Sequence, residues 1–381
     1  MNSENTIVID DRRCSFQQGE TILQVAQRNG IHIPTLCHLK GTSPTGACRI
    51  CLVEVEKARN LVASCAAPAV NDMIVKTGTP RVVKVRNMNI EFLLASGHHN
   101  CFAQDMDPDS WTDFQLRAME TKGHEDLCPA YGDCRLQELA VKYQIKTGRF
   151  MPVDTSFPIE DVNPFIVRDF SRCILCGRCV QACNEIQVNN AISLGYRGSS
   201  SKIVTKGDMP LKDSDCVFCG ECVQVCPVGA LITKHEFRSE RSKGETEDAK
   251  KIRTTCSYCG VGCQIYLHVI DDTVVKVTGV DDVPPNYGSL CVKGRFGFDF
   301  IHHQERLTTP MIRKNGELKD ASWDEALDIV AEKMKQIKKE SGPDSIGVLT
   351  SARISNEENY LAQKFTRAVI GTNNVDHCAR L

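Results

Sequence analysis

Two runs of four cysteines near the middle of the chain restrict its fold more than any other feature. Both have the spacing C-x2-C-x2-C-x3-C, and their members are Cys173, Cys176, Cys179 and Cys183, then Cys216, Cys219, Cys222 and Cys226. Zinc sites usually combine two C-x2-C pairs in a tetrahedron, and thiols spaced in triplets do not divide in that way. The chain has 21 cysteines, an odd number, and their short repeated spacings indicate metal binding rather than disulfides.

The two runs have the spacing of bacterial ferredoxins that hold two [4Fe–4S] clusters. In that pattern the fourth cysteine of each run binds the cluster of the other run, and we expect it at the start of a helix. The predicted ligands of one cluster are Cys173, Cys176, Cys179 and Cys226, and those of the other are Cys216, Cys219, Cys222 and Cys183. Gly177 and Gly220 leave room for backbone N–H groups to approach the cluster sulfides. The repeat predicts a duplicated ferredoxin domain over residues 151–238.

A cysteine set near the N-terminus has a different spacing. Its members follow the pattern C-x10-C-x2-C-x13-C and are Cys37, Cys48, Cys51 and Cys65. The segments TIVID, CLVEVE and MIVKT predict strands, and residues 20–29 predict a short amphipathic helix. A small sheet with one helix and a cysteine-bearing loop is the plan of a β-grasp [2Fe–2S] ferredoxin, which we expect over residues 1–80. The long first gap departs from the plant-type spacing. It resembles instead the N-terminal domain shared by the large electron-transfer subunit of complex I and the iron-only hydrogenases.

A further cluster site is implied by the same resemblance. In those families a helical segment follows, in which one imidazole and three thiolates hold a [4Fe–4S] cluster. The matching cysteines are Cys101, Cys128 and Cys134, although 26 residues separate the first two rather than two. His99 is the favoured imidazole, with His98 and His124 as alternatives, and an ordinary surface or capping role is the other interpretation of each. We expect this small helical domain, with its histidine-containing [4Fe–4S] site, over residues 81–150.

The last cysteine set follows a polar segment, residues 239–251, that predicts an exposed linker. Its members are Cys256, Cys259, Cys263 and Cys291, and the segments QIYLHVI and VVKVTGV between them predict strands. This arrangement, over residues 252–306, resembles the opening [4Fe–4S] domain of the bis-pterin molybdenum and tungsten oxidoreductases. The resemblance implies that Lys293 lies between the cluster and a pterin. Its charge would stabilise an electron crossing that gap, and a solvated surface lysine is the alternative.

Residues 307–381 resemble the start of the catalytic domain of the same family. Residues 323–339 and 356–369 predict helices, and SIGVLTS predicts a buried strand between them, although the strands are too few to cover both faces of a layer. The terminal string GTNNVDHCARL resembles formate dehydrogenase catalytic subunits. This implies that the selenocysteine or cysteine that binds molybdenum or tungsten comes just after Leu381. We therefore expect a UGA codon at that point, and an unrelated chain end is the alternative.

Nineteen cysteines fall into these sets, and Cys14 and Cys378 are interpreted as structural or incidental thiols. One [2Fe–2S] and four [4Fe–4S] clusters on one chain indicate electron transfer. The fold class that these modules predict is α+β and multidomain.

The resemblance implies a formate dehydrogenase that interconverts formate and CO2 at a Mo- or W-bis(pterin guanine dinucleotide). Electrons would pass through the Cys256 set, the ferredoxin-like clusters, the His-ligated cluster and the [2Fe–2S] cluster. They would leave to a flavin-bearing NAD(P)H-binding subunit or a hydrogenase subunit. Residues 1–381 alone are expected to be inactive toward formate. The alternatives are a stand-alone electron-transfer subunit of a hydrogenase or complex I-like assembly, and a structural protein with degenerate clusters.

Charge and hydropathy exclude two other classes of partner. The net charge is −2, so no basic field attracts nucleic acid. No run of 18 apolar residues predicts a membrane span, and no apolar segment follows Arg12 and Arg13 to complete an export signal. The sequence therefore predicts a cytoplasmic protein.

Overall fold

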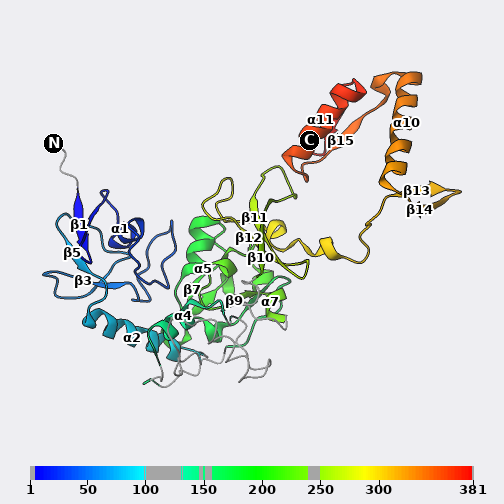
Figure 1. The fold of residues 1–381 in the computed structure, drawn as a ribbon. Coiled ribbons are helices and arrows are strands. Elements are labelled where there is room, and N and C mark those ends of the chain that lie inside the picture. Colours follow the sequence, from blue (N-terminus) through cyan, green and yellow to red (C-terminus); the bar gives the residue numbers. More distant parts are fainter. Residues whose placement is uncertain are drawn as a thin grey trace. The chain divides into compact units, whose positions relative to one another are not determined.

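The computed structural model describes residues 5–97, 99, 130, 132–145, 149–150, 157–238 and 249–379. The chain divides into two compact units, Met1–Asp248 and Ala249–Leu381 (Figure 1). Across these described ranges, no helix has both the length and the apolar character that a membrane span requires.

The N-terminal part of the first unit is a five-stranded sheet with one helix against it (Figure 1). Its strands are β1 Thr6–Ile9, β2 Arg12–Ser15, β3 Leu52–Val55, β4 Val62–Ala63 and β5 Ile74–Lys76, in the order β2-β1-β5-β3-β4. β1 and β5 are parallel, and the other neighbours are antiparallel. The helix α1, Ile22–Arg28, begins at a capping box in which Thr21 and Gln24 bind each other's backbone N–H groups. The predicted strands and helix are confirmed in this part of the chain.

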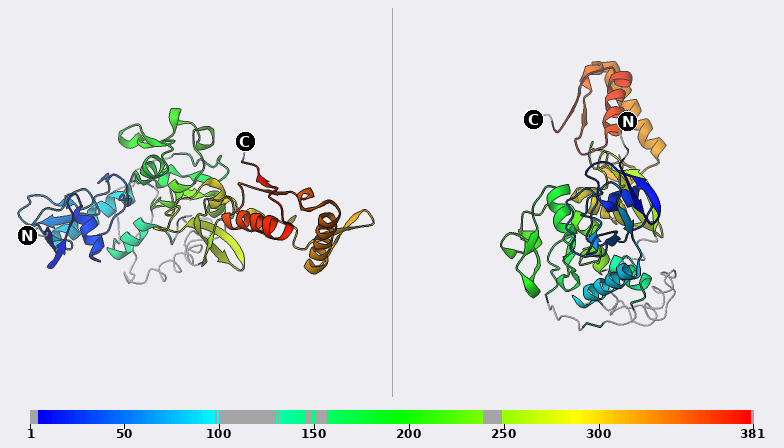
Figure 2. Two further views of the ribbon diagram at one scale, coloured as in Figure 1. Left: turned by 90° about the horizontal axis from the view of Figure 1, so that it is seen from above. Right: turned by 90° about the vertical axis from the view of Figure 1, so that its left-hand side faces the viewer.

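Two helices connect this sheet to the rest of the unit. α2 spans Pro80–Ala95, α4 spans Arg135–Lys142, and the two helices contact each other (Figures 1 and 2). Arg86 on α2 is 3% exposed. Its guanidinium donates to the carbonyls of Ile50 (2.9 Å) and Leu52 (3.0 Å) and to the hydroxyl of Tyr143 (2.8 Å). One buried cation therefore joins α2 to the cysteine loop that precedes β3 and to the end of α4.

The remainder of the first unit is built from two similar halves. Its regular elements are β6 Ile166–Arg168, η2 Phe170–Arg172, α5 Arg178–Gln181, η3 Ala182–Ile186, β7 Ser193–Gly195, η4 Gly198–Ser200, β8 Lys202–Val204, η5 Lys206–Asp208, η6 Leu211–Asp213, α6 Glu221–Gln224, β9 Leu231–Thr233 and α7 Lys234–Arg238. β6 pairs with β9 and β7 pairs with β8, both antiparallel. The same turn precedes α5 and α6, because Leu175 and Phe218 have left-handed backbones, as do Gly177 and Gly220. The duplication seen in the cysteine spacing is therefore present in the backbone.

The second unit opens with an antiparallel sheet of β10 Lys250–Thr255, β11 Gln264–Ile270 and β12 Thr273–Gly279, followed by α9 Val292–Phe296 and η7 Asp299–His302. The predicted strands β11 and β12 are confirmed. The prediction of a linker as far as Lys251 is wrong at its end, because Lys250 and Lys251 pair with Val269 and His268 in the sheet. All six residues of β10 are exposed, so this edge strand has none of the apolar alternation that marks a half-buried strand.

The last part of the chain consists of β13 Met311–Lys314, β14 Glu317–Asp320, α10 Trp323–Ser341, η8 Pro343–Ser345, β15 Val348–Thr350, α11 Asn356–Phe365, η9 Thr366–Ile370 and β16 Val375–His377. The helix predictions are confirmed, although α11 gives way to a wider π-type turn after Phe365. The prediction of a buried strand is wrong, because Leu349 is 87% exposed. Within the described residues β15 pairs only with β16, so no second layer covers its outer face. α10 likewise has no buried residue, and Leu327 and Val330 on its apolar face are exposed.

Candidate iron–sulfur cluster sites

The four thiols of the N-terminal set are all buried. They form two hydrogen-bonded pairs: Cys48 donates to Cys37, and Cys65 donates to Cys51. These bonds lower the pKa of Cys37 and of Cys51, because an accepted hydrogen bond stabilises a thiolate. The turn that brings the thiols together requires left-handed backbone at Gly46 (φ 61°) and Arg49 (φ 55°). The donor set is therefore sulfur only, as in ferredoxins that hold a [2Fe–2S] cluster by four cysteines.

The first ferredoxin-like set surrounds one apolar cavity. Its four thiols, Cys173, Cys176, Cys179 and Cys226, line that cavity together with Phe170, Ile174, Gly177, Ile203, Pro227, Val228, Ala230 and Leu231. Burial raises the pKa of Cys173 to about 11 and that of Cys176 to about 12. Thiols of this kind become thiolates when a bound cation compensates their charge. Four sulfur donors on an otherwise apolar wall fit a [4Fe–4S] cluster, and Cys226 comes from the other run, as the ferredoxin pattern predicts.

The second ferredoxin-like set brings Cys183 to the cysteines of the other run. Burial, followed by the charges of Cys219, Cys216 and Cys183, raises the pKa of Cys222 well above its usual range. The expected position of the fourth cysteines is wrong. Cys183 lies in the π-type turn after α5, and Cys226 comes two residues after the end of α6. Because each helix starts directly after Gly177 or Gly220, its first turn carries the third cysteine of the run instead.

Backbone N–H groups approach the thiol sulfurs in a repeated way. The amide two residues after the cysteine donates to the sulfur in five cases, which are Ile50 to Cys48, Leu175 to Cys173, Arg178 to Cys176, Phe218 to Cys216 and Tyr258 to Cys256. The bond from Phe218 N to Cys216 Sγ measures 3.4 Å. Hydrogen bonds to ligand sulfurs disperse negative charge and raise the reduction potential of a cluster. The tight loops expected around the cysteines therefore also provide donors.

The last set is assembled within the second unit. Cys256 N donates to Cys263 O (2.8 Å), and the charges of Cys256, Cys259 and Cys291 all act on the pKa of Cys263, after burial. Asn286 joins the two loops concerned: Gln264 N donates to its side-chain oxygen (2.7 Å), and its amide nitrogen donates to Ser289 O (3.1 Å). The donor set is again four sulfurs, but Cys291 is exposed in this part of the chain. Lys293, two residues later on α9, is exposed as well.

The predicted histidine-containing site is described only in part. Cys134 is buried at the start of α4, and His99 is half-buried, with its backbone N–H donating to Gly97 O (2.8 Å). The predicted ligands Cys101 and Cys128 and the alternatives His98 and His124 lie outside the described residues.

Two cysteines were assigned no cluster. Cys14 is buried in the core of the N-terminal sheet. Cys378 is exposed, and Ala352 N donates to its sulfur (3.5 Å), a bond that lowers its pKa. Among the described residues, no three His, Cys, Asp or Glu side chains converge on one point as they would around a single metal ion. Cluster ligands need no such convergence, because each thiolate binds a different iron or shares one with a single partner.

Three of the predicted sites share one apolar core within the first unit. That core contains cysteines of the N-terminal set, of the predicted histidine-containing site and of the first ferredoxin-like set, which are Cys37, Cys48, Cys134 and Cys176, with Cys173 and Cys226 packed against it. Sequence reasoning missed the contacts that produce this arrangement. Ser43 N donates to the Glu185 carboxylate (2.7 Å), and the Gln181 amide donates to Ser43 O. Both pairs are separated by more than 130 residues, and no local pattern marks them.

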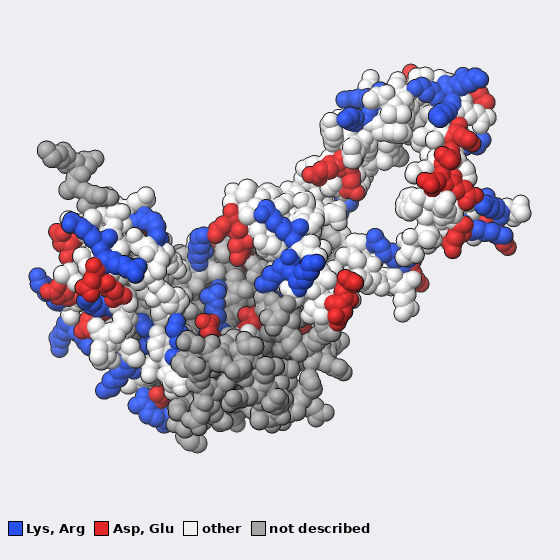
Figure 3. Space-filling model, in the orientation of Figure 1, with Lys and Arg blue, Asp and Glu red and all other residues white. Residues whose placement is uncertain are grey.

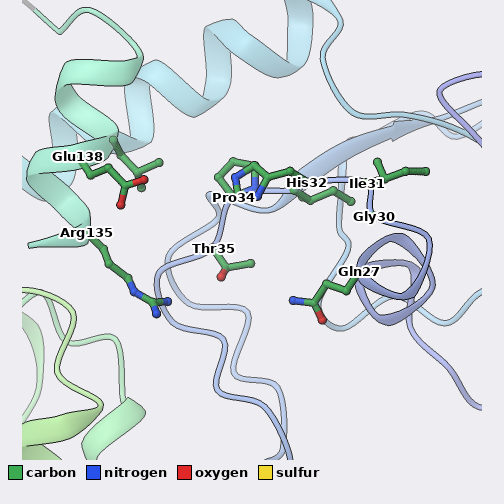
Figure 4. Close-up of a pocket in the computed structure, with 10 residues that line it drawn as sticks. Gln27, Gly30, Ile31, His32, Pro34, Thr35, Arg135 and Glu138 are labelled. Atoms are coloured by element: carbon green, nitrogen blue, oxygen red, sulfur yellow. The ribbon is translucent and has the colours of Figure 1, made fainter. Parts of the chain in front are cut away.

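A cleft of about 560 Å³ opens beside this core. It is lined by Gln27, Gly30, Ile31, His32, Ile33, Pro34, Thr35, Arg135, Glu138 and Leu139. Figure 4 shows Arg135 and Glu138, on α4, facing the loop that carries His32 and Thr35. Burial lowers the pKa of His32, which keeps this imidazole neutral at neutral pH. The cleft thus runs between the loop before Cys37 and the helix after Cys134.

Surface charge on the described residues has no dominant sign. Figure 3 shows acidic and basic side chains interspersed over one face of the molecule. This mixed pattern agrees with the net charge of −2.

Four family models match the chain in succession. The 2Fe-2S iron-sulfur cluster binding domain matches residues 3–80, and the 4Fe-4S dicluster domain matches residues 172–230. The molybdopterin oxidoreductase Fe4S4 domain matches residues 249–303, and the molybdopterin oxidoreductase family matches residues 306–381. Over these four ranges the chain is similar to iron–sulfur cluster domains and to the molybdopterin oxidoreductase family.

Two relatives and one solved structure are similar to large parts of the chain. "Putative formate dehydrogenase YrhE" of Bacillus subtilis is 33% identical over 412 residues, covering 98% of this chain and 40% of the relative. An NADH-quinone oxidoreductase subunit of Rhizobium meliloti is 33% identical over 376 residues, again covering 98% of this chain and 40% of the relative. A chain of the NAD+-reducing [NiFe]-hydrogenase in the H2-reduced state is 29% identical with a TM-score of 0.51, over 61% of this chain and 88% of that one. The chain thus spans about 40% of the length of these curated relatives.

Proposed function

We propose that the chain carries electrons between a Mo- or W-bis(pterin guanine dinucleotide) site and a partner redox subunit, in an enzyme that interconverts formate and CO2. The observation that carries the electron-transfer part is the cavity lined by Cys173, Cys176, Cys179 and Cys226. Thiols from both halves of a duplicated fold meet there on an apolar wall, which suits a [4Fe–4S] cluster. The predicted cluster ligands and their domain boundaries belong to the same proposal.

When bound, the clusters would supply one-electron carriers, and the pterin-bound metal would supply the two-electron chemistry on formate. The chain contributes position and electrostatics. All four cysteines of the N-terminal set, and Cys176 and Cys179 of the first ferredoxin-like set, are buried away from water. Backbone amides such as those of Leu175 and Phe218 donate to ligand sulfurs. Lys293 would place a positive charge beside the last site, at the end facing the pterin.

Two observations support formate as the substrate of the proposed enzyme. They are the resemblance of residues 371–381 to formate dehydrogenase catalytic subunits and the name of the Bacillus subtilis relative. The chain spans about 40% of that relative, so formate is proposed as the substrate of the whole protein. The similarities to an NADH-quinone oxidoreductase subunit and to a hydrogenase chain support the proposed partner redox subunit. One relative is a subunit of an NADH-quinone oxidoreductase, and the similar solved chain comes from an NAD+-reducing hydrogenase. A flavin-bearing NAD(P)H-binding subunit or a hydrogenase subunit would therefore contact the N-terminal modules.

The test is to produce the 381-residue chain anaerobically with iron and sulfide and to record its metal content and EPR spectra. We expect iron without zinc, a [2Fe–2S] signal in the reduced protein, and several [4Fe–4S] signals. Cys226→Ser should lose one [4Fe–4S] cluster, whereas Cys14→Ser, which alters a buried thiol outside the predicted sites, should lose none. A protein that binds zinc instead, or that holds no cluster after anaerobic assembly, would contradict the electron-transfer function.

A second candidate is a stand-alone electron carrier of a hydrogenase, and one observation favours it. The similarity to the hydrogenase chain covers 88% of that chain, so nearly its whole length finds a counterpart here. The two candidates differ in which substrate reduces the clusters of the intact enzyme. Cluster reduction by formate supports the first, and reduction by hydrogen but not by formate supports the second.

A further inference from the structure

Arg178 is a buried cation between two of the proposed cluster sites. It is the first residue of α5, directly after the left-handed Gly177, and it is 7% exposed. Cys176 and Cys179 flank it in the sequence, and Gly177 and Gln181, on either side of it, contact Thr45 and Ser43 of the loop that carries Cys37. Cys176 and Cys179 belong to the first ferredoxin-like site, and Cys37 belongs to the N-terminal site. The guanidinium is therefore within electrostatic range of both donor sets, and it keeps its proton, as arginine does in proteins.

The loop between Cys37 and Cys48 contacts the turn and helix that carry Arg178. A Cβ placed on Gly177 would lie 3.7 Å from the methyl group of Thr45, whose hydroxyl hydrogen-bonds the thiol of Cys37. One turn further along α5, the side chain of Gln181 donates to Ser43 O. Contacts on either side of Arg178 thus hold the loop of one site against the helix of the other.

The guanidinium is not neutralised by a protein carboxylate in the described part of the chain. Its Nε and Nη1 atoms are buried and make no hydrogen bond to any described residue. A cation buried in this way is costly unless negative charge lies nearby. Iron–sulfur clusters with four thiolate ligands carry net negative charge, and each gains one more negative charge when it is reduced. The two proposed clusters would therefore supply the compensating charge that Arg178 lacks.

The duplicated turn in the other half of the fold carries the opposite kind of residue. Its sequence is CGEC instead of CGRC, so Glu221 occupies the position that corresponds to Arg178. Glu221 is also buried, at 4% exposed. The second ferredoxin-like site therefore has a carboxyl group at the place where the first has a cation.

We propose that Arg178 is a positioning residue shared by two clusters, which raises the reduction potentials of the N-terminal [2Fe–2S] cluster and of the first [4Fe–4S] cluster together. This inference rests on the proposed function, since it requires both clusters to be present. A cation near a cluster favours its reduced, more negative state and so raises its potential. Because one charge acts on both clusters, it shifts both potentials in the same direction.

The test is an EPR-monitored redox titration of the full 381-residue chain and its variants. In Arg178→Gln we expect the equilibrium constant for reduction to fall about tenfold at both clusters, a shift of about 59 mV for a one-electron couple. The [2Fe–2S] signal is followed at temperatures where the [4Fe–4S] signals have broadened. Among the [4Fe–4S] transitions, one should move with it, and that of the second ferredoxin-like cluster should change much less.

Arg59→Gln is the matched control, because it removes an exposed arginine between β3 and β4, outside the turns that carry the predicted ligands. Its shift should be small, since water screens an exposed charge. Arg178→Lys keeps the charge, so it should keep both potentials near those of the unchanged protein. If Arg178→Gln fails to assemble its clusters, Arg178→Met, which also removes the charge, replaces it in the titration with the same expected and contradicting results.

Three outcomes overturn the inference. They are assembled clusters with no shift in Arg178→Gln, a shift at only one of the two clusters, and an equal shift in Arg59→Gln. An unchanged protein that holds no [2Fe–2S] cluster would instead contradict the proposed function, so the two failures are distinguishable.

Discussion

The backbone amide of Ser43 donates a 2.7 Å hydrogen bond to the carboxylate of Glu185, 142 residues further along the chain. Ser43 lies between Cys37 and Cys48, and Glu185 follows Cys183, so the bond joins loops that carry ligands of different predicted clusters. Two domains that the sequence presents as separate modules are therefore in direct contact within the first unit.

Removing the Glu185 acceptor should loosen the N-terminal cysteine loop. In Glu185→Ala we expect the Ser43 amide to exchange with solvent about tenfold faster, equivalent to about 1.4 kcal/mol. Hydrogen exchange read by mass spectrometry measures this directly. Glu317→Ala, which alters an exposed residue in the second unit, serves as the control. Unchanged exchange at Ser43 in Glu185→Ala would show that the bond does not hold the loop.

Arg86 should be the most stability-sensitive arginine of α2. Arg86→Met leaves the buried carbonyls of Ile50 and Leu52 without their donor, at a cost of about 2–3 kcal/mol. Lys84→Met makes the same kind of change at an exposed position of the same helix and should change stability by less than about 0.5 kcal/mol. Urea unfolding of the two variants under anaerobic conditions measures the difference. Equal midpoints would contradict the role given to Arg86.

The exchange of fourth cysteines between the two runs makes a prediction about pairs of variants. Cys226→Ser should lose the same cluster as Cys173→Ser, and Cys183→Ser should lose the same cluster as Cys216→Ser. The potentials of the [4Fe–4S] clusters that remain identify which one was lost. If Cys183→Ser instead matches Cys173→Ser, each run binds its own cluster and the crossed assignment is wrong.

Gly97 is expected to tolerate no side chain. A Cβ at this position would lie 2.2 Å from Ser171 O, two residues before Cys173, so the backbone would have to move. Gly97→Ala should therefore cost about 1–3 kcal/mol, the usual cost of overpacking, and should disturb His99 nearby. Gly78→Ala is the matched control, because a Cβ there meets nothing within 4 Å. The midpoint temperatures of thermal unfolding are compared between Gly97→Ala and Gly78→Ala. Equal midpoints would contradict the prediction that a side chain at Gly97 clashes with Ser171 O.

Lys293 should matter for the rate of electron transfer and not for cluster assembly. In the intact enzyme, Lys293→Met should slow formate-dependent cluster reduction about tenfold and leave the iron content unchanged, while Lys293→Arg keeps the charge and most of the rate. Rapid-mixing absorbance of the clusters measures the rate. Lys319→Met, at an exposed position of β14, should have no effect. An unchanged rate in Lys293→Met would show that Lys293 is a solvated surface residue with no role in electron transfer.

Local sequence patterns predicted the elements and the donor sets but not the contacts between them. The alternation in TIVID and CLVEVE reflects one buried face of a sheet, and it predicted β1 and β3 correctly. Alternation of apolar and polar residues failed to predict β10. An edge strand with both faces exposed needs no such alternation. The sequence pattern also overestimated the burial of β15, since apolar residues indicate a buried strand only when another layer covers them.

The candidate sites show the same limit. Spacing was sufficient to group Cys173 and Cys176 with the distant Cys226, because the ferredoxin turn is local and duplicated. Arg178 and Thr45 carried no signal of their own. An arginine beside a cysteine is ordinary in sequence, and its position between two sites depends on how the N-terminal loop seats on α5. The contrast between CGRC and CGEC was the one trace of this arrangement that the sequence contained.

The apolar core that contains Cys37, Cys134 and Cys176 has a consequence for how such a chain matures. If iron binds these thiols as proposed, the metal is part of the interior and not an addition to a finished surface. Metal-binding free energy is then folding free energy, and cluster insertion and folding become a single event. In a cell short of iron, the product would not be an idle carrier awaiting its clusters. It would be an unfinished chain with reactive thiols exposed, open to oxidation and proteolysis, so iron supply would set how much of this protein survives.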